Sequence, residues 1–129
     1  MARIIKSSDN KIKRGYIWTV DLRSGIGSEV TKKRPSLIVS NNTVNNISPT
    51  VVIIPLSSQI YKILGPERLF IAKKESKLAK DSVILVTQIR AIDKTRLIKP
   101  ISLISKDKLR EVEEAIRIVL DLKENSFLQ

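Results

Sequence analysis

The feature that most constrains the fold is a run of six apolar residues, Val51 to Leu56, in a chain of 129 residues. A run of this length, rich in β-branched side chains, predicts a strand that is buried on both faces. Such a strand needs neighbours, and other segments of strand-like composition surround it. They are Tyr16 to Leu22, Ser36 to Ser40, Leu69 to Ala72, Ser82 to Thr87 and Leu97 to Leu103. Short strands separated by turn-rich links predict a small, mostly antiparallel sheet.

One clear helical pattern lies near the C-terminus. Ser105 is expected to cap its start, and Asp107 suits the first turn. Glu113 and Arg117 are four residues apart in the order that favours an ion pair on a helix. Apolar residues recur at helical spacing, which makes a stripe that we interpret as core or as a dimer contact: Leu109, Val112, Ile116, Val119 and Leu120.

Strands that come first and one helix that comes last predict a mainly β fold. The expected architecture is a small β-barrel, or a partly open barrel, with a C-terminal helix packed against it. A chain of this length fills one modest core. We expect a short polar tail over residues 1–10, a single domain over residues 11–124 and a C-terminal tail over residues 125–129.

Polar links join the expected strands. Residues 23–34, RSGIGSEVTKKR, predict a loop of about a dozen residues, and loops of this length are often functional. Pro35 is expected to open the next strand, because its missing N–H is tolerated there. Residues 41–50, NNTVNNISPT, predict turns, and residues 88–96 predict a polar link with room for a helical turn.

The charge of the chain is strongly positive, at +11, and it is concentrated at the front. Residues 1–34 hold nine Lys or Arg against three Asp or Glu. An excess of this size favours an anionic partner, either nucleic acid, an acidic protein or a membrane surface. The alternative is that the charge serves solubility alone. No run of 18 apolar residues and no leader-like segment is present, so we expect no membrane span and a cytoplasmic protein.

The composition also limits the chemistry. The chain has no cysteine and no histidine, which excludes thiolate sites, serine or cysteine triads and the commonest general base. The acidic residues are scattered without the spacing of a cage for a hard metal ion, and no glycine-rich phosphate loop is present. We therefore expect no cofactor. An enzyme of this composition would work without a metal, a histidine or a thiol.

Polar groups at the junctions of loops and strands are the candidates for a site. Arg34 stands directly before a proline, which restricts its backbone to an extended conformation, and a guanidinium matches a phosphate with two hydrogen bonds. Ser28 and Glu29 lie earlier in the same loop, and Thr50 ends a Ser-Pro-Thr step before the apolar strand. The alternatives are a solvated surface charge, an ordinary turn and an ordinary threonine at the start of a strand.

An ordered series of short motifs resembles the MazF/PemK family of toxins. The resemblance extends from about Lys11 to Leu122. The motifs are Lys13-Arg14-Gly15, Ile17-Trp18, Asp21-Leu22, Gly27-Ser28-Glu29, Arg34-Pro35, Val39-Ser40-Asn41, Ser48-Pro49-Thr50, Pro55-Leu56, Asp81-Ser82-Val83, Gln88-Ile89-Arg90, Ile92-Asp93-Lys94 and Arg96-Leu97. The resemblance implies an SH3-like β-barrel that forms a homodimer. It also implies a sequence-specific, metal-independent endoribonuclease that cuts single-stranded mRNA and so inhibits translation and growth.

The same resemblance implies roles for individual residues. Arg34 and Thr50 would be the catalytic pair. A guanidinium stays charged at neutral pH, so Arg34 suits the stabilisation of phosphoryl charge better than the uptake of a proton. Residues of the long loop and of the Gln-Ile-Arg step would contact RNA: Ser28, Glu29, Lys32, Lys33 and Gln88. The implied partners are single-stranded RNA and an acidic, MazE-like antitoxin, with DNA contacted only through the antitoxin complex.

Three positions depart from the family pattern, namely Tyr16, Val30 and Asn42. Val30 lies in the loop that would meet RNA, so it bears on the base preference. Two other functions stay open: a CcdB-like toxin of the same fold that poisons DNA gyrase, and a basic barrel that binds nucleic acid without cutting it. The Arg34-Pro35 and Ser48-Pro49-Thr50 steps favour RNA cleavage.

Overall fold

The computed structural model describes residues 10–23, 32–60 and 65–123. Its strands are β1 (Tyr16–Leu22), β2 (Lys32–Ile38), β3 (Thr50–Ser57), β4 (Arg68–Ile71), β5 (Ser82–Leu85), β6 (Arg90–Asp93) and β7 (Leu97–Leu103). Its helices are α1 (Asn42–Ile47), α2 (Lys73–Ser76) and α3 (Lys106–Val119), with short 3₁₀ turns η2 (Val86–Gln88) and η3 (Lys94–Arg96).

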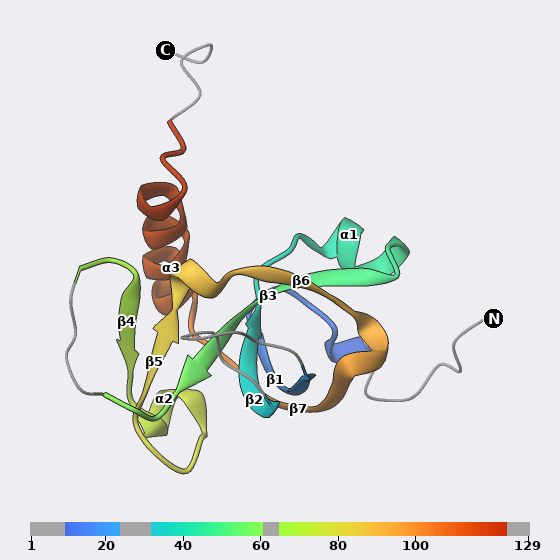
Figure 1. The fold of residues 1–129 in the computed structure, drawn as a ribbon, viewed down its shortest axis with the longest axis horizontal. Helices are drawn as coiled ribbons and strands as arrows, with labels where there is room; N and C mark the ends of the chain where they lie inside the picture. The colour runs from blue at the N-terminus through green and yellow to red at the C-terminus, as the bar shows by residue number, and fades with distance from the viewer. Residues whose placement is uncertain (1–9, 24–31, 61–64, 124–129) are drawn as a thin grey trace.

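The seven strands form one antiparallel sheet in the order β4-β5-β3-β2-β1-β7, with β6 also paired to β3. This confirms the mainly β fold with a C-terminal helix. Among the described residues no pairing joins β4 to β7, so the curved sheet is not closed. Helix α3 lies at the β4–β5 end of the sheet, and α1 lies on the other side of the molecule, near the start of β3 (Figure 1).

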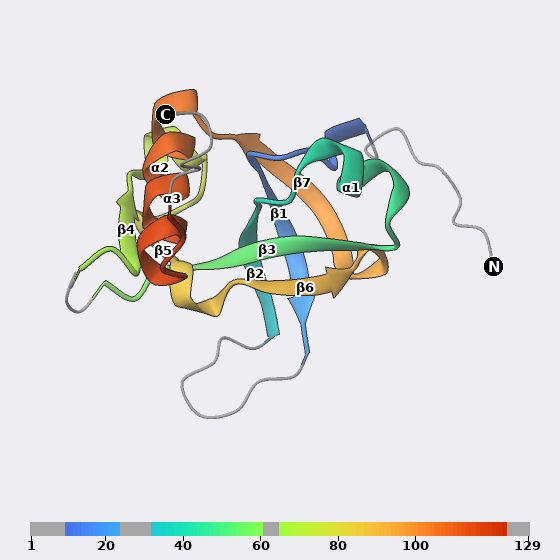
Figure 2. The same ribbon diagram turned by 90° about the horizontal axis from the view of Figure 1, so that it is seen from above.

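One end of the β1–β2 pair extends beyond the rest of the sheet. The two strands pair as far as Leu22 opposite Lys32. The pairing of β2 with β3 starts only at Ser36. In Figure 2 this end of the pair passes β3 and β6 and stands clear of them. Residues 32–35 therefore lie on a ribbon at the rim of the sheet, where β2 pairs with β1 alone and β7 follows the other edge of β1 only as far as Val20.

Two hydrophobic clusters fill the interior. The α3 core includes Val112 and Ala115 of the helix together with Leu37, Ile54 and Leu56 of the sheet. A second cluster, called the Trp18 core here, contains Ile12, Trp18, Val20, Leu22, Ile38, Val51, Ile53, Ile92 and Leu97. The even-numbered residues of β3 thus face the α3 core and the odd-numbered ones face the Trp18 core, because side chains alternate along a strand. In β2 the order is reversed.

Helix α3 forms where the sequence pattern predicts a helix, with the predicted N-cap. Ser105 caps it by accepting the N–H of Lys108 at 3.1 Å. Most of the predicted stripe packs on the α3 core, although Leu120 stays 48% exposed. The predicted pair of Glu113 with Arg117 does not form. Glu113 instead accepts a hydrogen bond from the guanidinium of Arg14, a residue outside the helix.

Three predictions for the links are wrong. Pro35 lies inside β2, opposite Thr19, and does not open the strand. The asparagine-rich stretch forms α1, because Asn41 accepts the N–H of Val44 at 2.8 Å and so caps a helical turn. The expected polar link over residues 88–96 holds β6, an edge partner of β3, although its predicted helical turn is present as η3. Strands Tyr16–Leu22 and Leu97–Leu103 have the predicted bounds.

No helix in the described parts of the chain is long and apolar enough to cross a membrane.

Candidate functional site

The exposed end of β2 carries the predicted arginine. Arg34 lies opposite Val20 of β1, and the residue is exposed. Lys32 and Lys33 precede it in the strand and are exposed as well. The sequence places all three in a loop, and this prediction is wrong, since β2 already begins at Lys32, whose φ of 65° marks the entry to the strand. A strand holds these cations in place more firmly than a loop would.

The register of β2 against β3 relates Arg34 to a hydroxyl group at the end of β3. Ser36 of β2 pairs with Pro55 of β3. If this register continued two residues further outward, Arg34 would be level with Ser57, the last residue of β3, although the two strands are not paired there. Both residues belong to the Trp18-core face of their strands. Pro35 has no N–H to offer, and the pairing of β2 with β3 stops at its neighbour, which leaves this end of the strand pair open.

Arg34 and Thr50 are not brought together within one chain. Thr50 is the first residue of β3 and pairs with Asp93, at the end of the strand opposite to Ser57. Seven residue steps separate these ends, which is about 23 Å of extended strand. Thr50 also belongs to the other face of β3. The register of one chain therefore does not place Arg34 and Thr50 at one phosphate, and their role as a catalytic pair stays a prediction.

Thr50 has a clear structural environment instead. Its hydroxyl oxygen lies 3.1 Å from that of Ser48, and Ser48 Oγ accepts the Thr50 N–H at 3.2 Å. The carbonyl of Pro49 accepts the N–H of Lys94 at 3.0 Å. These bonds end α1 and start β3. The Ser-Pro-Thr step therefore fixes the junction between a helix and a strand.

Ser57 is the hydroxyl that the sequence analysis missed. It is half-buried, and its Oγ accepts the N–H of Gln59 at 3.1 Å. The signal was present, since Ser57 directly follows the most apolar strand as Thr50 directly precedes it. Only the pairing of two strands that are distant in sequence shows which end of β3 lies next to Arg34.

A cavity of about 300 Å³ opens beside Arg34. Its lining comes from three parts of the chain, the β2 rim, the end of β3 and the turn before β5: Arg34, Pro35, Leu56, Ser58, Leu78, Ala79, Lys80 and Ser82. Half of these side chains are apolar, and two of them are cationic. Within the residues that the structure describes, neither Arg34 nor Lys80 has a carboxylate partner.

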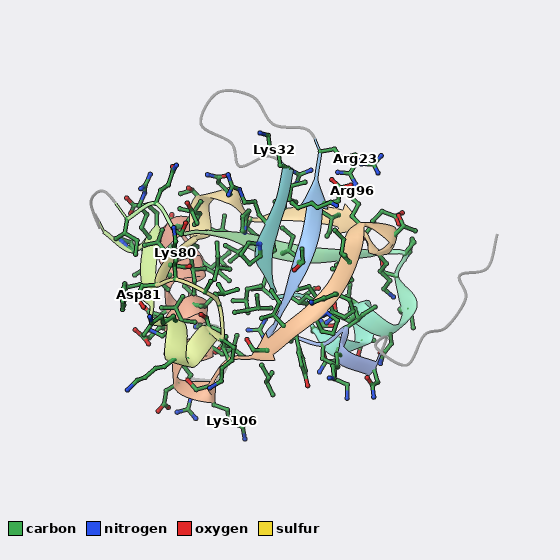
Figure 3. The ribbon with its side chains drawn as sticks, turned by 90° about the horizontal axis from the view of Figure 1, so that it is seen from below. Arg23, Lys32, Lys80, Asp81, Arg96 and Lys106 are labelled. Carbon is green, nitrogen blue, oxygen red and sulfur yellow. The ribbon has the colours of Figure 1, made fainter. Side chains whose placement is uncertain are left out.

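Further cations gather at the tip of the β1–β2 ribbon. Figure 3 shows Arg23, Lys32 and Arg96 close together at one end of the molecule. Asp21 accepts a hydrogen bond from Arg23 Nε at 2.7 Å, and this bond raises the pKa of the Arg23 guanidinium above its ordinary value. One nitrogen of Arg96, Nη1, is buried without a hydrogen-bond partner in the described structure. A buried donor without a partner is costly, and an anion would satisfy it.

The other predicted contact residues fall in two groups. Gln88 ends η2 and is half-buried. It lies along β3 between the pairings of Ile84 with Leu56 and of Arg90 with Ile53, which is the half of β3 nearer to Ser57. Ser28 and Glu29 lie outside the described residues. The described residues contain no group of three acidic side chains placed to hold a metal ion.

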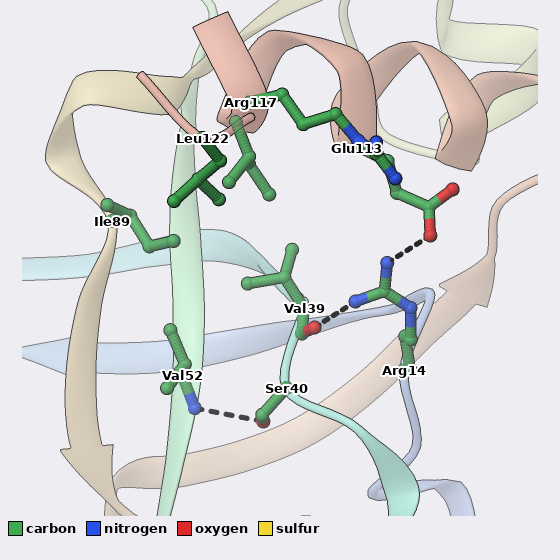
Figure 4. Close-up of a pocket in the computed structure, with 9 residues that line it drawn as sticks. Arg14, Val39, Ser40, Val52, Ile89, Glu113, Arg117 and Leu122 are labelled. Carbon is green, nitrogen blue, oxygen red and sulfur yellow. Dashed lines mark hydrogen bonds and ion pairs between the residues drawn. The ribbon is translucent and has the colours of Figure 1, made fainter. Parts of the chain in front are cut away.

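A second cavity, of about 330 Å³, lies under the C-terminal end of α3. Arg14 closes one side of it: Nη2 donates to Glu113 at 2.6 Å, and Nη1 donates to the carbonyl of Val39 (Figure 4). Val39, Val52, Ile89, Ile116 and Leu122 supply its apolar lining. The arginine of the Lys-Arg-Gly motif therefore ties the start of the sheet to the helix.

Solved structures share this open sheet with a C-terminal helix. An endoribonuclease in complex with its cognate antitoxin, from Mycobacterial species, superposes with a TM-score of 0.70 at 23% identity, covering 88% of this chain and 98% of that one. MazF from Deinococcus radiodurans gives 0.73 at 20% identity, covering 85% and 96%. The Mycobacterium tuberculosis toxin MazF-mt6 gives 0.69 at 18% identity, covering 84% and 99%. The fold is thus that of the small MazF-type toxins.

The family itself is established by the sequence. Residues 13–120 match the model of the PemK-like, MazF-like toxins of type II toxin–antitoxin systems. The match spans most of the chain. This chain therefore belongs to the PemK/MazF toxin family.

Proposed function

We propose that this chain is a toxin that cuts single-stranded mRNA as a metal-independent endoribonuclease, with Arg34 at the scissile phosphate. The observation that carries the proposal is the position of Arg34, an exposed arginine on the rim of the sheet that lines a cavity and has no carboxylate partner in the described residues. Family membership and the likeness to proteins described as endoribonucleases support it.

The chemistry suits the residues that are present. RNA carries its own nucleophile, the 2′-hydroxyl, so the enzyme must align that group and stabilise charge on the phosphoryl oxygens. Arg34 offers a fixed positive charge with two donors toward one phosphate. Ser57 offers a hydroxyl that donates to a phosphoryl oxygen or orients the 2′-hydroxyl. In this proposal Ser57 takes the catalytic place that the sequence assigned to Thr50.

The basic rim would bind the RNA backbone on either side of the cut. Lys32 and Lys33 precede Arg34 on the same exposed ribbon, and Gln88 lies toward the same half of β3. Ser28 and Glu29 keep their proposed role as RNA contacts. Single-stranded substrate is expected because base edges can be read when the bases are unstacked.

The proposed partners follow from the family and from the charge. Toxins of type II systems act with an antitoxin, and one of the similar structures holds its cognate antitoxin. A toxin of net charge +11 fits an acidic antitoxin segment. We include in the proposal a homodimer, a cytoplasmic location, and contact with DNA only through the antitoxin complex.

The test uses the purified full chain and a long purified RNA, with excess EDTA and without gyrase. The wild-type protein should cut the RNA and leave a 5′-hydroxyl with a 2′,3′-cyclic or 3′ phosphate, and Arg34→Ala should not. Mapping of the new 5′ ends gives the cut sequence. A strict requirement for Mg²⁺, or undiminished cleavage by Arg34→Ala, would overturn the proposal.

A further inference from the structure

We infer that the cavity beside Arg34 holds one nucleotide next to the scissile phosphate and sets the base preference at that position. The inference rests on the proposed function and adds a specificity-determining subsite to it. Its two decisive residues are Leu78, in the wall of the cavity, and Lys80, on its rim. Both come from the turn between α2 and β5, a segment to which the sequence analysis assigned no role.

The lining matches the two kinds of surface that a nucleotide presents. Pro35, Leu56, Leu78 and Ala79 form apolar walls that suit the flat faces of a base. The hydroxyl of Ser58 lies among them and can bond a base edge. Small-ligand sites combine apolar walls with a few fixed polar groups in this way, and proteins read unstacked bases by packing on their faces and bonding their edges.

The two cations of the cavity come from two different segments of the chain, as a nucleotide with a phosphate on each side of its sugar would require. Arg34 stands on the β2 side of the cavity, and Lys80 stands in the turn before β5. Both residues are exposed. A nucleotide is bounded by two phosphates, so one phosphate would meet Arg34 and the next would meet Lys80. An uncharged apolar ligand would leave both cations unused, and the cationic pair therefore favours a nucleotide.

The turn that carries Leu78 and Lys80 is held from several sides. Asp81 Oδ1 accepts the N–H of Lys73 at 2.8 Å, and Ser82 Oγ donates to the carbonyl of Lys80 at 3.1 Å. The N–H of Leu78 donates to Ser76 Oγ at 3.1 Å. A wall fixed by such bonds discriminates between bases better than one that can yield, because a poor fit cannot be relieved by movement.

The turn is anchored to the sheet as well. Ser76 is fully buried, and its carbonyl accepts a hydrogen bond from the Ser102 hydroxyl of β7. Lys77 adopts a left-handed conformation with φ of 64°, which ends α2 and directs the chain into the cavity wall. The turn is thus held to β7 two residues before Leu78, and β7 in turn pairs with β1, the strand that lies beside Arg34.

The experiment compares Leu78→Trp, Leu78→Ala and Lys80→Gln with the control Lys106→Gln, a lysine that is exposed but does not line the cavity (Figure 3). Two readouts are measured: base frequencies around the mapped cuts in a long RNA, and affinity over a salt series for an oligonucleotide of the wild-type cut sequence with 2′-deoxy sugars. The second readout needs no cleavage. Thermal unfolding shows whether each variant is folded.

The expected results are specific to each variant. Leu78→Trp fills the cavity and Leu78→Ala enlarges it, so each should change the preference at one position beside the cut by roughly tenfold and leave the other positions alone. Lys80→Gln should lower the slope of log affinity against log salt by about 0.7, the share of one phosphate on a single strand. Lys106→Gln should match the wild type in both readouts.

Each of the other outcomes overturns the subsite, the proposed function or both. If the wild type cuts RNA, Arg34→Ala does not, and the folded Leu78 and Lys80 variants keep both the base preference and the salt slope, the subsite is wrong and the proposed function stands. If the wild type leaves RNA intact but Lys80→Gln lowers the salt slope for a mixed-sequence oligonucleotide, the ribonuclease and the base preference at a cut are wrong, and the cavity is a nucleotide-binding site alone. If neither cleavage nor a Lys80-dependent slope is found, both are wrong.

Discussion

Two arginines, Arg14 and Arg34, each line one of the two cavities described above, and their roles differ. Arg14 is 26% exposed in its side chain, and its guanidinium is held by Glu113 and by the carbonyl of Val39. Arg34 stands on an exposed rim, and the described residues give it no carboxylate. A satisfied guanidinium stabilises the fold, whereas one without partners is available to an anion from outside. The partners of an arginine, rather than its presence in a motif, separate the two roles.

The largest effect on cleavage is expected when the Arg34 guanidinium is removed. Arg34→Ala should reduce the rate of RNA cleavage at least 10²- to 10³-fold, the usual loss when a donor to developing charge is removed. The free energy of unfolding should change by less than about 0.5 kcal/mol, because the residue is exposed. Single-turnover cleavage and thermal denaturation measure the two quantities. A loss of stability that accounts for the loss of cleavage would make Arg34 another structural arginine.

The next effect tests the neighbour of Arg34 with a matched pair of hydroxyl deletions. Ser57→Ala should reduce cleavage about 10²-fold, since Ser57 ends β3 on the side toward Arg34 and is proposed to act with it. Thr50→Ala should stay within about threefold of the wild type, because Thr50 lies at the far end of β3 and its bonds are structural. The rate constant of each variant on one RNA decides between them. A larger loss for Thr50→Ala than for Ser57→Ala would restore the pair that the sequence suggested.

The third effect is expected at Arg14, where stability should change and cleavage should not. Arg14→Ala should lower the free energy of unfolding by about 1–2 kcal/mol, through the loss of its bonds to Glu113 and Val39. Cleavage per folded molecule should be unchanged. Lys13→Ala, which removes the exposed neighbouring cation, serves as the control and should alter neither quantity. Denaturant titration and activity at equal folded concentration give the comparison. A cleavage defect in fully folded Arg14→Ala would place this residue in the site.

The smallest effect concerns the lysines beside Arg34. Lys32→Gln and Lys33→Gln should each lower the salt slope of RNA affinity by about 0.7 if each neutralises one phosphate. The rate of cleavage of bound RNA should stay within about twofold of wild type, since neither lysine is proposed at the scissile phosphate. Binding titrations at several ionic strengths measure the slope. A slope equal to that of the wild type would show that the RNA path avoids the ribbon.

The sequence predicted the helix and the strands whose pattern is contained within a few neighbouring residues. The apolar run Val51 to Leu56 and the stripe on α3 each reach their predicted place, because periodicity and burial are coded within a few residues. Helix α1 was missed because asparagines favour turns, and here Asn41 uses its side chain to cap a helix. Strand β6 was missed because its charged ends resemble a link, although pairing to β3 makes it a strand.

The site was less accessible to sequence reasoning, for a physical reason. Motifs selected Arg34, Ser48-Pro49-Thr50 and the Gln88 step, but the neighbour of Arg34 depends on the register of β2 against β3. Register is a long-range property that no local pattern contains. The Leu78–Ser82 turn was missed for the same reason, since nothing in its composition shows that it faces β2.

The pairing of β3 has a consequence for how the protein opens in solution. β3 is bonded to β2 along one edge and to β5 and β6 along the other, so its amide hydrogens should exchange with deuterium only when the whole domain unfolds. The ribbon at residues 32–35 has β1 as its one strand neighbour, and its amides should exchange through local opening. Arg34 would then be carried by a part of the sheet that can open while β3 keeps the rest of the domain intact.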